Sequence, residues 1–121
     1  REEKFFETPV RFFKNLPVDI YIKLMNQCSA LIGNSSSGIR EGAFIGTPCI
    51  NFGSRQANRD RAKNVIDIDK YTDNEFQKAL EKHLYHGKYQ SSAIYGEGNA
   101  AERILEILKG EKPKIQKIFF E

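Results

Sequence analysis

The sequence predicts an α/β fold, a parallel Rossmann-like sheet with helices on both faces. Short apolar runs of strand length alternate with segments whose apolar residues recur at helical spacing. No hairpin signal joins two of these runs, which favours parallel strands connected by helices. We expect about four strands and four helices. A complete doubly wound domain has more, so we expect the chain to be part of a larger fold.

Length and composition are those of one ordinary globular domain. The 121 residues are 40% hydrophobic and 29% charged. A net charge of +3 is too small to predict a nucleic-acid partner. No apolar run is long enough to span a membrane and no signal-peptide core opens the chain, so we predict a cytoplasmic protein. Cys28 and Cys49 have no metal-binding spacing and are predicted to be reduced, mostly buried thiols.

The first part of the chain is predicted to contain a strand, a helix and a second strand. Residues 10–13, three of which are apolar, are expected to be the first strand. Ile20, Leu24 and Cys28 then recur at helical spacing. The corner at residues 16–18 is only a turn as far as its residues indicate. The second strand is expected at residues 30–32, which are apolar.

A serine-rich loop follows that strand. Ser35, Ser36 and Ser37, with a glycine, open a predicted helix that carries Ile39 and Ala43. The first backbone N–H groups of a helix lack partners within it, and they lie at the positive end of the helix dipole. With three hydroxyl groups beside them they suit a phosphate or diphosphate. In the alternative interpretation the serines only cap the helix.

Three further features favour a ligand site at this loop. Glu41 lies about one turn inside the predicted helix, where it must face solvent or a polar ligand such as ribose, because unpaired burial is costly. Residues 46–48 end the helix and lead into a strand at residues 49–52, so the loop lies at the carboxyl edge of a parallel pair, where ligands gather. Arg55 follows at that edge and could hold a phosphate through two hydrogen bonds.

The second half is predicted to contain a strand, two helices and an apolar tail. Residues 65–68 form the strand, and Thr72 and Glu75 form a capping box that opens the next helix. The apolar stripe of this helix is predicted to consist of Phe76, Ala79, Leu80, His83 and Leu84. That of the last helix is predicted to consist of Ala101, Ile104, Leu105 and Leu108. The tail at residues 118–120 needs a partner surface, on this domain or on another.

The motifs, in order, resemble the C-terminal half of hydrolysing UDP-N-acetylglucosamine 2-epimerases. The matching strings are GNSSSGIRE from residue 33, GTP from residue 46, Arg55 with Gln56, and YGEGNA from residue 95. The family has two Rossmann-like halves of the glycosyltransferase-B type, with the active site in the cleft between them. The resemblance implies that residues 1–121 are a single, partial UDP-binding C-terminal domain whose N-terminal domain is absent.

The resemblance also implies an activity. Such enzymes eliminate UDP from a UDP-sugar and hydrate the glycal to the free 2-epimer, typically on the way to sialic acid. The UDP-binding positions would be Ser35, Ser36, Ser37, Glu41, Arg55 and, at the corner facing the base, Val18. Arg55 would also be catalytic, because it would bind the leaving diphosphate. The acid and the base belong mainly to the other half, so the fragment is expected to be inactive. The resemblance further implies a homo-oligomer for the full-length protein.

Neither a cofactor nor a metal site is predicted. His83 and His86 lack a third ligand. Three alternative functions stay open: a non-hydrolysing epimerase, a glycosyltransferase-B-type UDP-sugar transferase, and a non-catalytic nucleotide-binding module. The sugar is also open, since UDP-N-acetylglucosamine and UDP-N,N'-diacetylbacillosamine present the same nucleotide.

Overall fold

A single parallel sheet forms the centre of the chain in the computed structural model, which describes residues 10–95, 99–109 and 119–120. The strand order is β3, β2, β1, β4. The strands are β1 (Leu31–Gly33), β2 (Cys49–Phe52), β3 (Val65–Ile68) and β4 (Phe119–Phe120). In the register, Cys49 lies between Leu31 and Val65. The predicted parallel α/β architecture is confirmed.

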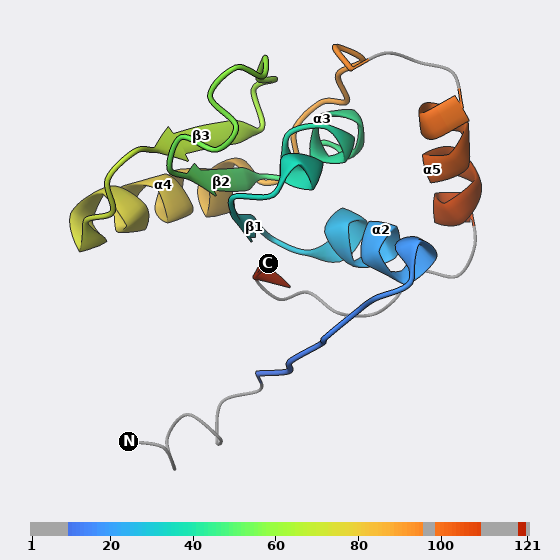
Figure 1. Cartoon of the computed structure of the whole chain (residues 1–121), viewed down its shortest axis with the longest axis horizontal. Coiled ribbons are helices and arrows are strands. Elements are labelled where there is room, and N and C mark those ends of the chain that lie inside the picture. Colours follow the sequence, from blue (N-terminus) through green and yellow to red (C-terminus); the bar gives the residue numbers. More distant parts are fainter. Residues whose placement is uncertain (1–9, 96–98, 110–118, 121) are drawn as a thin grey trace.

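Helices cover both faces of the sheet (Figure 1). On one side lie α2 (Val18–Gln27), α3 (Glu41–Ile45) and α5 (Asn99–Lys109), and on the other α4 (Asp73–His86) packs against β2 and β3. Alternation along β1 separates two cores, because successive strand side chains point to opposite faces. Leu31 belongs to a cluster with Met25 and Ile104, whereas Ile32 packs with Ile50 and Ala79.

The fourth strand is not the one that the sequence predicts. Residues 10–13 have no strand structure, and Val10, Phe12 and Phe13 are exposed, so that prediction is wrong. In Figure 1 this segment leads away from the body of the fold. Phe119 pairs with Leu31 along the edge of β1 instead. Two apolar runs compete for one strand edge, and their composition does not indicate which of them pairs.

The helical stripes differ in detail from the predictions. In α2 the buried residues are Ile22, Leu24 and Met25, whereas Ile20 is exposed. In α4 and α5 the predicted stripe residues Leu84 and Leu105 are exposed as well. Each of these helices turns one face to the core. In α4 and α5 the predicted stripe is wider than the buried face, whereas in α2 it is displaced, because Ile22 is buried and lies outside the predicted stripe.

The predicted Thr72 cap at the start of α4 is confirmed. The Thr72 hydroxyl accepts a hydrogen bond from the Glu75 backbone N–H at 3.1 Å, and Gly87 ends the helix. The chain then crosses the end of α3, because the N–H groups of Tyr89 and Ser92 donate to the carbonyl groups of Gly46 and Ala43, each at 2.8 Å. Within the described residues, neither Cys28 nor Cys49 forms a disulfide bond. In the part of the chain that the structure describes, no helix has the length and apolar character needed to cross a membrane.

Candidate functional site

The serine loop begins directly after β1. Ser36–Gly38 form a short 3-10 helix, and the separate helix α3 starts only at Glu41. The Ser35 hydroxyl accepts a hydrogen bond from the Ser37 N–H at 3.2 Å, so this serine caps the turn. The prediction of one continuous helix is therefore wrong, and Glu41 lies in the first turn of α3 rather than one turn inside a longer helix.

Close packing against the sheet and a buried side chain interrupt the helix. A Cβ atom at Gly38 would lie 2.6 Å from the Cys49 sulfur, so only glycine lets the turn approach β2 this closely. The buried Asn64 amide donates to the Gly38 carbonyl at 3.1 Å and to the Thr47 carbonyl at 2.8 Å. These bonds fix both ends of the α3 segment to the chain just before β3.

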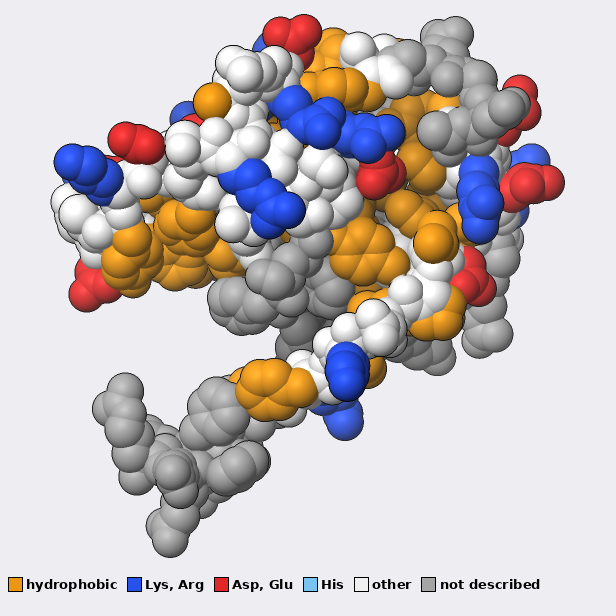
Figure 2. Space-filling view, viewed as in Figure 1, with side chains coloured by type: hydrophobic (Ala, Val, Ile, Leu, Met, Phe, Trp, Pro, Cys, Tyr) orange, Lys and Arg blue, Asp and Glu red, His pale blue; other side chains and the backbone are white. Residues whose placement is uncertain are grey.

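A hollow of about 700 Å³ lies where the chain leaves β1 and β2. Its lining comes from the two loops that follow these strands: Asn34, Ser35, Ser36, Ser54, Arg55, Gln56, Ala57, Asn58 and Arg59. The lining contains two guanidinium groups and no carboxylate. Figure 2 shows several Lys and Arg side chains in the upper middle of the face in view. The charge of the hollow is suited to an anion.

Three of the predicted site residues meet in this hollow. Ser35 and Ser36 line it from one loop and Arg55 from the other. Ser37 does not line it, and its hydroxyl lies 2.6 Å from the Tyr21 hydroxyl and 3.0 Å from that of Ser35. The sequence thus predicts the meeting of the two loops, but not that the third serine is bound within the fold.

Glu41 and Val18 lie outside the lining of the hollow. The Glu41 carboxylate is 3.8 Å from the guanidinium of Arg40, and its side chain is about one-third exposed, at 31%. Val18 lies in a second hollow of about 690 Å³ between the start of α2 and α5, which Arg103 also lines. Their roles in binding ribose and base stay predictions.

Gln56 ties the two loops of the first hollow together. Its side chain is buried, with 7% of the residue exposed. The amide nitrogen donates to the Asn34 carbonyl at 3.1 Å, and the amide oxygen accepts from Arg59 Nε at 2.6 Å. A buried amide with both ends bonded fixes the loop geometry, because leaving either end unpaired would be costly.

The loop between β2 and β3, residues 53–64, carries Arg55, Arg59, Arg61 and Lys63 and is called the basic loop. Arg61, bonded to Asp67 in β3, anchors its far end. Arg61 Nε and Nη2 donate to the two Asp67 oxygens at 2.9 and 3.0 Å. Desolvation alone would raise the pKa of Asp67, but the hydrogen bonds from Arg61 and Asn51 outweigh it, and the pKa lies below its usual value. Arg61 Nη1 also donates to the Gln56 carbonyl at 2.6 Å. The hydrogen bonds of Arg61 to Asp67 and Gln56 therefore stabilise the loop.

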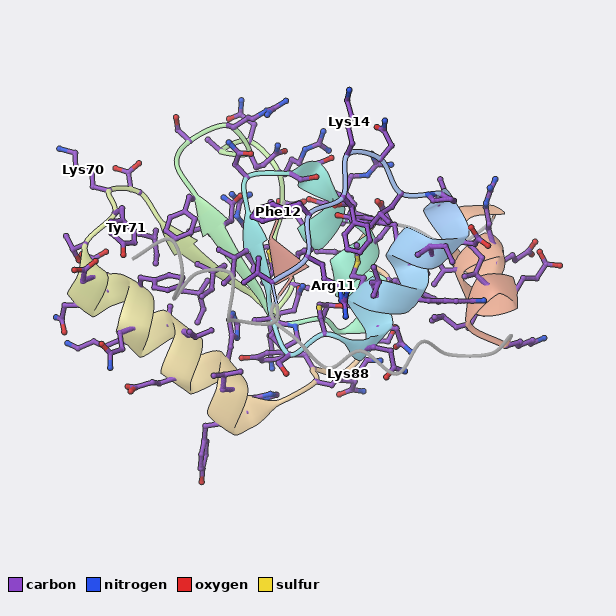
Figure 3. All side chains as sticks on the ribbon, turned by 90° about the horizontal axis from the view of Figure 1, so that it is seen from below. Arg11, Phe12, Lys14, Lys70, Tyr71 and Lys88 are labelled. Atoms are coloured by element: carbon purple, nitrogen blue, oxygen red, sulfur yellow. The ribbon has the colours of Figure 1, made fainter. Side chains whose placement is uncertain are left out.

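A third, apolar hollow of about 660 Å³ adjoins the carboxyl ends of the strands. The rings of Phe52, Tyr71 and Phe76 line it, with centroids 5.9 to 6.0 Å apart. Figure 3 shows Tyr71 beside the start of α4. Gly33 and Gly53 line this hollow, whereas the residues that follow them, Asn34 and Ser54, line the cationic hollow. The two hollows are thus neighbours at one edge of the sheet.

The sequence does not predict the structural roles of Gln56 and Asn64, whose side chains tie distant segments together. Gln56 bonds a residue 22 positions away and Asn64 one 26 positions away, and no local pattern indicates such bonds. The one available signal was a glutamine and an asparagine within a strongly charged loop. Within the described ranges, no group of three or more His, Cys, Asp or Glu side chains could hold a metal ion.

The fold and the hollow define an α/β domain with a cationic site at the carboxyl edge of a parallel sheet. The family described as UDP-N-acetylglucosamine 2-epimerase matches residues 2–109. The chain therefore belongs to the UDP-N-acetylglucosamine 2-epimerase family.

Two of the following three relatives are named as hydrolysing enzymes. The chain is 47% identical over 72 residues to the GDP/UDP-N,N'-diacetylbacillosamine 2-epimerase (hydrolyzing) of Campylobacter jejuni, covering 60% of this chain and 18% of that protein. It is 38% identical over 100 residues to the UDP-N,N'-diacetylbacillosamine 2-epimerase (hydrolyzing) of Legionella pneumophila, covering 83% and 26%. It is 31% identical over 99 residues to the UDP-N-acetylglucosamine 2-epimerase of Neisseria meningitidis, covering 79% and 26%. The chain thus spans about a quarter or less of the length of these relatives.

Proposed function

We propose that this chain is the C-terminal, UDP-binding part of a hydrolysing UDP-sugar 2-epimerase. The single observation that carries the proposal is the hollow in which Ser35, Ser36 and Arg55 meet with no carboxylate in its lining. A diphosphate there would receive hydroxyl and backbone donors from one loop and a guanidinium fork from the other. Glu41 would bind the ribose, and Val18 and Ser37 would complete the nucleotide site.

The proposed reaction has two steps. A base removes the proton from C2 of the sugar while the bond between C1 and the UDP oxygen breaks, which gives a glycal and free UDP. Water then adds across the double bond, hydroxyl to C1 and a proton to C2 on the opposite face, which gives the free 2-epimer. This chain would contribute Arg55, whose charge opposes the negative charge that grows on the leaving diphosphate. The acid and the base would come from outside residues 1–121.

Two sugars fit the proposal. The relatives at 47% and 38% identity are named for GDP/UDP-N,N'-diacetylbacillosamine and for UDP-N,N'-diacetylbacillosamine, which favours the diacetylbacillosamine sugar over N-acetylglucosamine. Proton NMR of the reaction of the full-length protein with each UDP-sugar would separate the alternatives. A free 2-epimer with UDP indicates hydrolysis, a UDP-linked epimer indicates the non-hydrolysing reaction, and transfer only to an added acceptor indicates a transferase.

Calorimetric titration of the 121-residue chain tests the nucleotide site directly. UDP should bind weakly and UMP more weakly still, because UMP lacks the second phosphate. Glu41→Ala should weaken UDP binding by about 1 to 3 kcal/mol, the usual range for a hydrogen bond to a charged group. Glu75→Ala on α4 removes the same charge away from the hollow and should leave the affinity unchanged. Equal affinities for UDP and UMP would contradict the proposed diphosphate site.

A further inference from the structure

The basic loop carries three arginines with different environments. The charge of Arg61 is compensated by the Asp67 carboxylate, to which it donates two hydrogen bonds. Arg55 and Arg59 line the cationic hollow, and neither has an ion-pair partner among residues 10–95, 99–109 and 119–120. Two guanidinium charges thus face one hollow, although the nucleotide site proposed above uses only one of them.

The orientation of Arg59 is set by a residue that is itself fixed. Arg59 Nε donates to the Gln56 amide oxygen at 2.6 Å, and the Gln56 amide nitrogen donates to the Asn34 carbonyl in the serine loop. Nε is bonded to Gln56, and no described residue binds the two terminal nitrogens of Arg59, so these can bind a ligand. A guanidinium that is oriented in advance loses less conformational entropy when it binds an anion.

We propose that Arg59 is a second diphosphate-binding residue and that Gln56 is the positioning residue that directs it into the hollow. The inference rests on the proposed function in one respect, that the diphosphate belongs to a nucleotide. A diphosphate has enough oxygens to engage two guanidinium groups, one on each phosphate, whereas a single phosphate favours one. The second arginine therefore selects a nucleoside diphosphate over a monophosphate.

Titration calorimetry of the 121-residue chain with inorganic pyrophosphate and with UDP tests the inference. Arg59→Ala should weaken the binding of both ligands about 10-fold or more, within the range for charge-assisted hydrogen bonds, and should change UMP binding much less. Arg59→Lys should recover only part of the loss. Lys63→Ala is the matched control: it removes one charge from the same loop outside the hollow, and should change affinity less than about 2-fold.

The role of Gln56 is tested by coupling. Gln56→Leu should weaken pyrophosphate binding in the wild-type background and much less in the Arg59→Ala background, since it acts through Arg59. Circular dichroism and melting curves identify variants that do not fold, and Gln56→Met, which keeps the length of the side chain and removes both polar amide atoms, replaces Gln56→Leu if the latter fails to fold. Equal losses in both backgrounds would show that Gln56 does not act through Arg59.

The outcomes separate the inference from the proposed function. If wild type binds pyrophosphate in an Arg59-dependent manner but does not bind UDP, the anion site stands and the nucleotide function is wrong. If wild type binds UDP, and Arg59→Ala binds UDP and pyrophosphate as tightly as wild type does, the proposed function stands and the role of Arg59 is overturned.

Discussion

Arg55 and Arg61 lie six positions apart in one loop and differ in what holds them. Arg61 forms a two-pronged ion pair with Asp67, whereas no described residue forms an ion pair with Arg55. A guanidinium in a protein is always charged, so the one that lacks a partner is available to an anionic ligand. Residue type alone does not separate these two arginines, but their partners do.

Arg55→Ala in the full-length enzyme should lower kcat about 100-fold or more and change KM less. Charge on the leaving oxygen is larger in the transition state than in the bound substrate, so a donor directed there affects turnover more than binding. Arg55→Lys should recover part of the loss. Steady-state kinetics with the UDP-sugar measure both constants, and a rise in KM with unchanged kcat would reduce Arg55 to a binding residue.

His83 is a fully buried histidine in α4 with both ring nitrogens bonded. Nε2 lies 2.8 Å from the Cys49 carbonyl oxygen and Nδ1 lies 3.0 Å from the Tyr89 hydroxyl. The carbonyl can only accept, so Nε2 carries the proton and Nδ1 accepts from Tyr89. Burial lowers the pKa of His83, although the bond to the carbonyl opposes the shift. The residue is a neutral bridge between α4, β2 and the segment that follows.

Stability should therefore fall as the pH falls below about 6.5, the ordinary pKa of histidine. The folded-state pKa is lower than the unfolded one, so in this window the unfolded chain binds more protons. One histidine changes the free energy of unfolding by at most about 1.4 kcal/mol per pH unit. Urea unfolding between pH 5 and pH 8 measures it. His83→Gln should remove this component and His86→Gln, an exposed neighbour, should retain it; equal slopes in the two variants would contradict this role of His83.

At the scale of elements, α3 is held at its end by a glycine. Gly46 has φ of 87°, a conformation that favours glycine. A Cβ atom there would also lie 2.0 Å from the Tyr89 carbonyl oxygen. Gly46 thus meets two requirements at once, the left-handed turn that starts β2 and the close passage of the segment after α4.

Gly46→Ala should destabilise the fold by about 2 kcal/mol or more, the sum of backbone strain and a clash with backbone. Gly53→Ala is the matched control, because Gly53 has φ of 80° but nothing within 4 Å of an added Cβ atom. It should cost only the strain, about 1 kcal/mol. Denaturant unfolding measures both, and equal losses would mean that the packing against Tyr89 contributes nothing.

The sequence predicts the elements whose signals are local and fails where elements compete. The apolar runs of β1, β2 and β3 and the Thr72 cap of α4 needed no distant information. Residues 10–13 resemble a strand equally well, but a strand exists only where an edge is free to pair. The break before α3 depends on Gly38 packing against Cys49 and on the Asn64 amide, contacts between segments far apart in the chain.

The candidate site likewise has a part that the sequence predicts and a part that it does not. Ser35, Ser36 and Arg55 were predictable because the carboxyl ends of neighbouring parallel strands must meet. The bond between Gln56 and Asn34 was not, since it depends on how a loop of irregular backbone folds. The roles of Glu41, Val18 and Ser37 concern a ligand and stay predictions.

In the molecule as a whole, the cationic hollow lies at one edge of the sheet. The chain spans about a quarter of the length of the Legionella and Neisseria relatives. We expect the 121-residue chain to fold alone and to release no UDP from a UDP-sugar, because the proposed acid and base lie outside it. A coupled assay for free UDP measures this. Release above that of a no-protein control, and lost in Arg55→Ala, would contradict it.

The hollow between the serine loop and the basic loop is proposed to bind the diphosphate of UDP. A crystal structure of the 121-residue chain with UDP would show where the diphosphate lies. We expect it to contact Ser35, Ser36 and Arg55, with the ribose toward Glu41. A diphosphate bound elsewhere, with Arg55 directed into solvent, would overturn the proposed site.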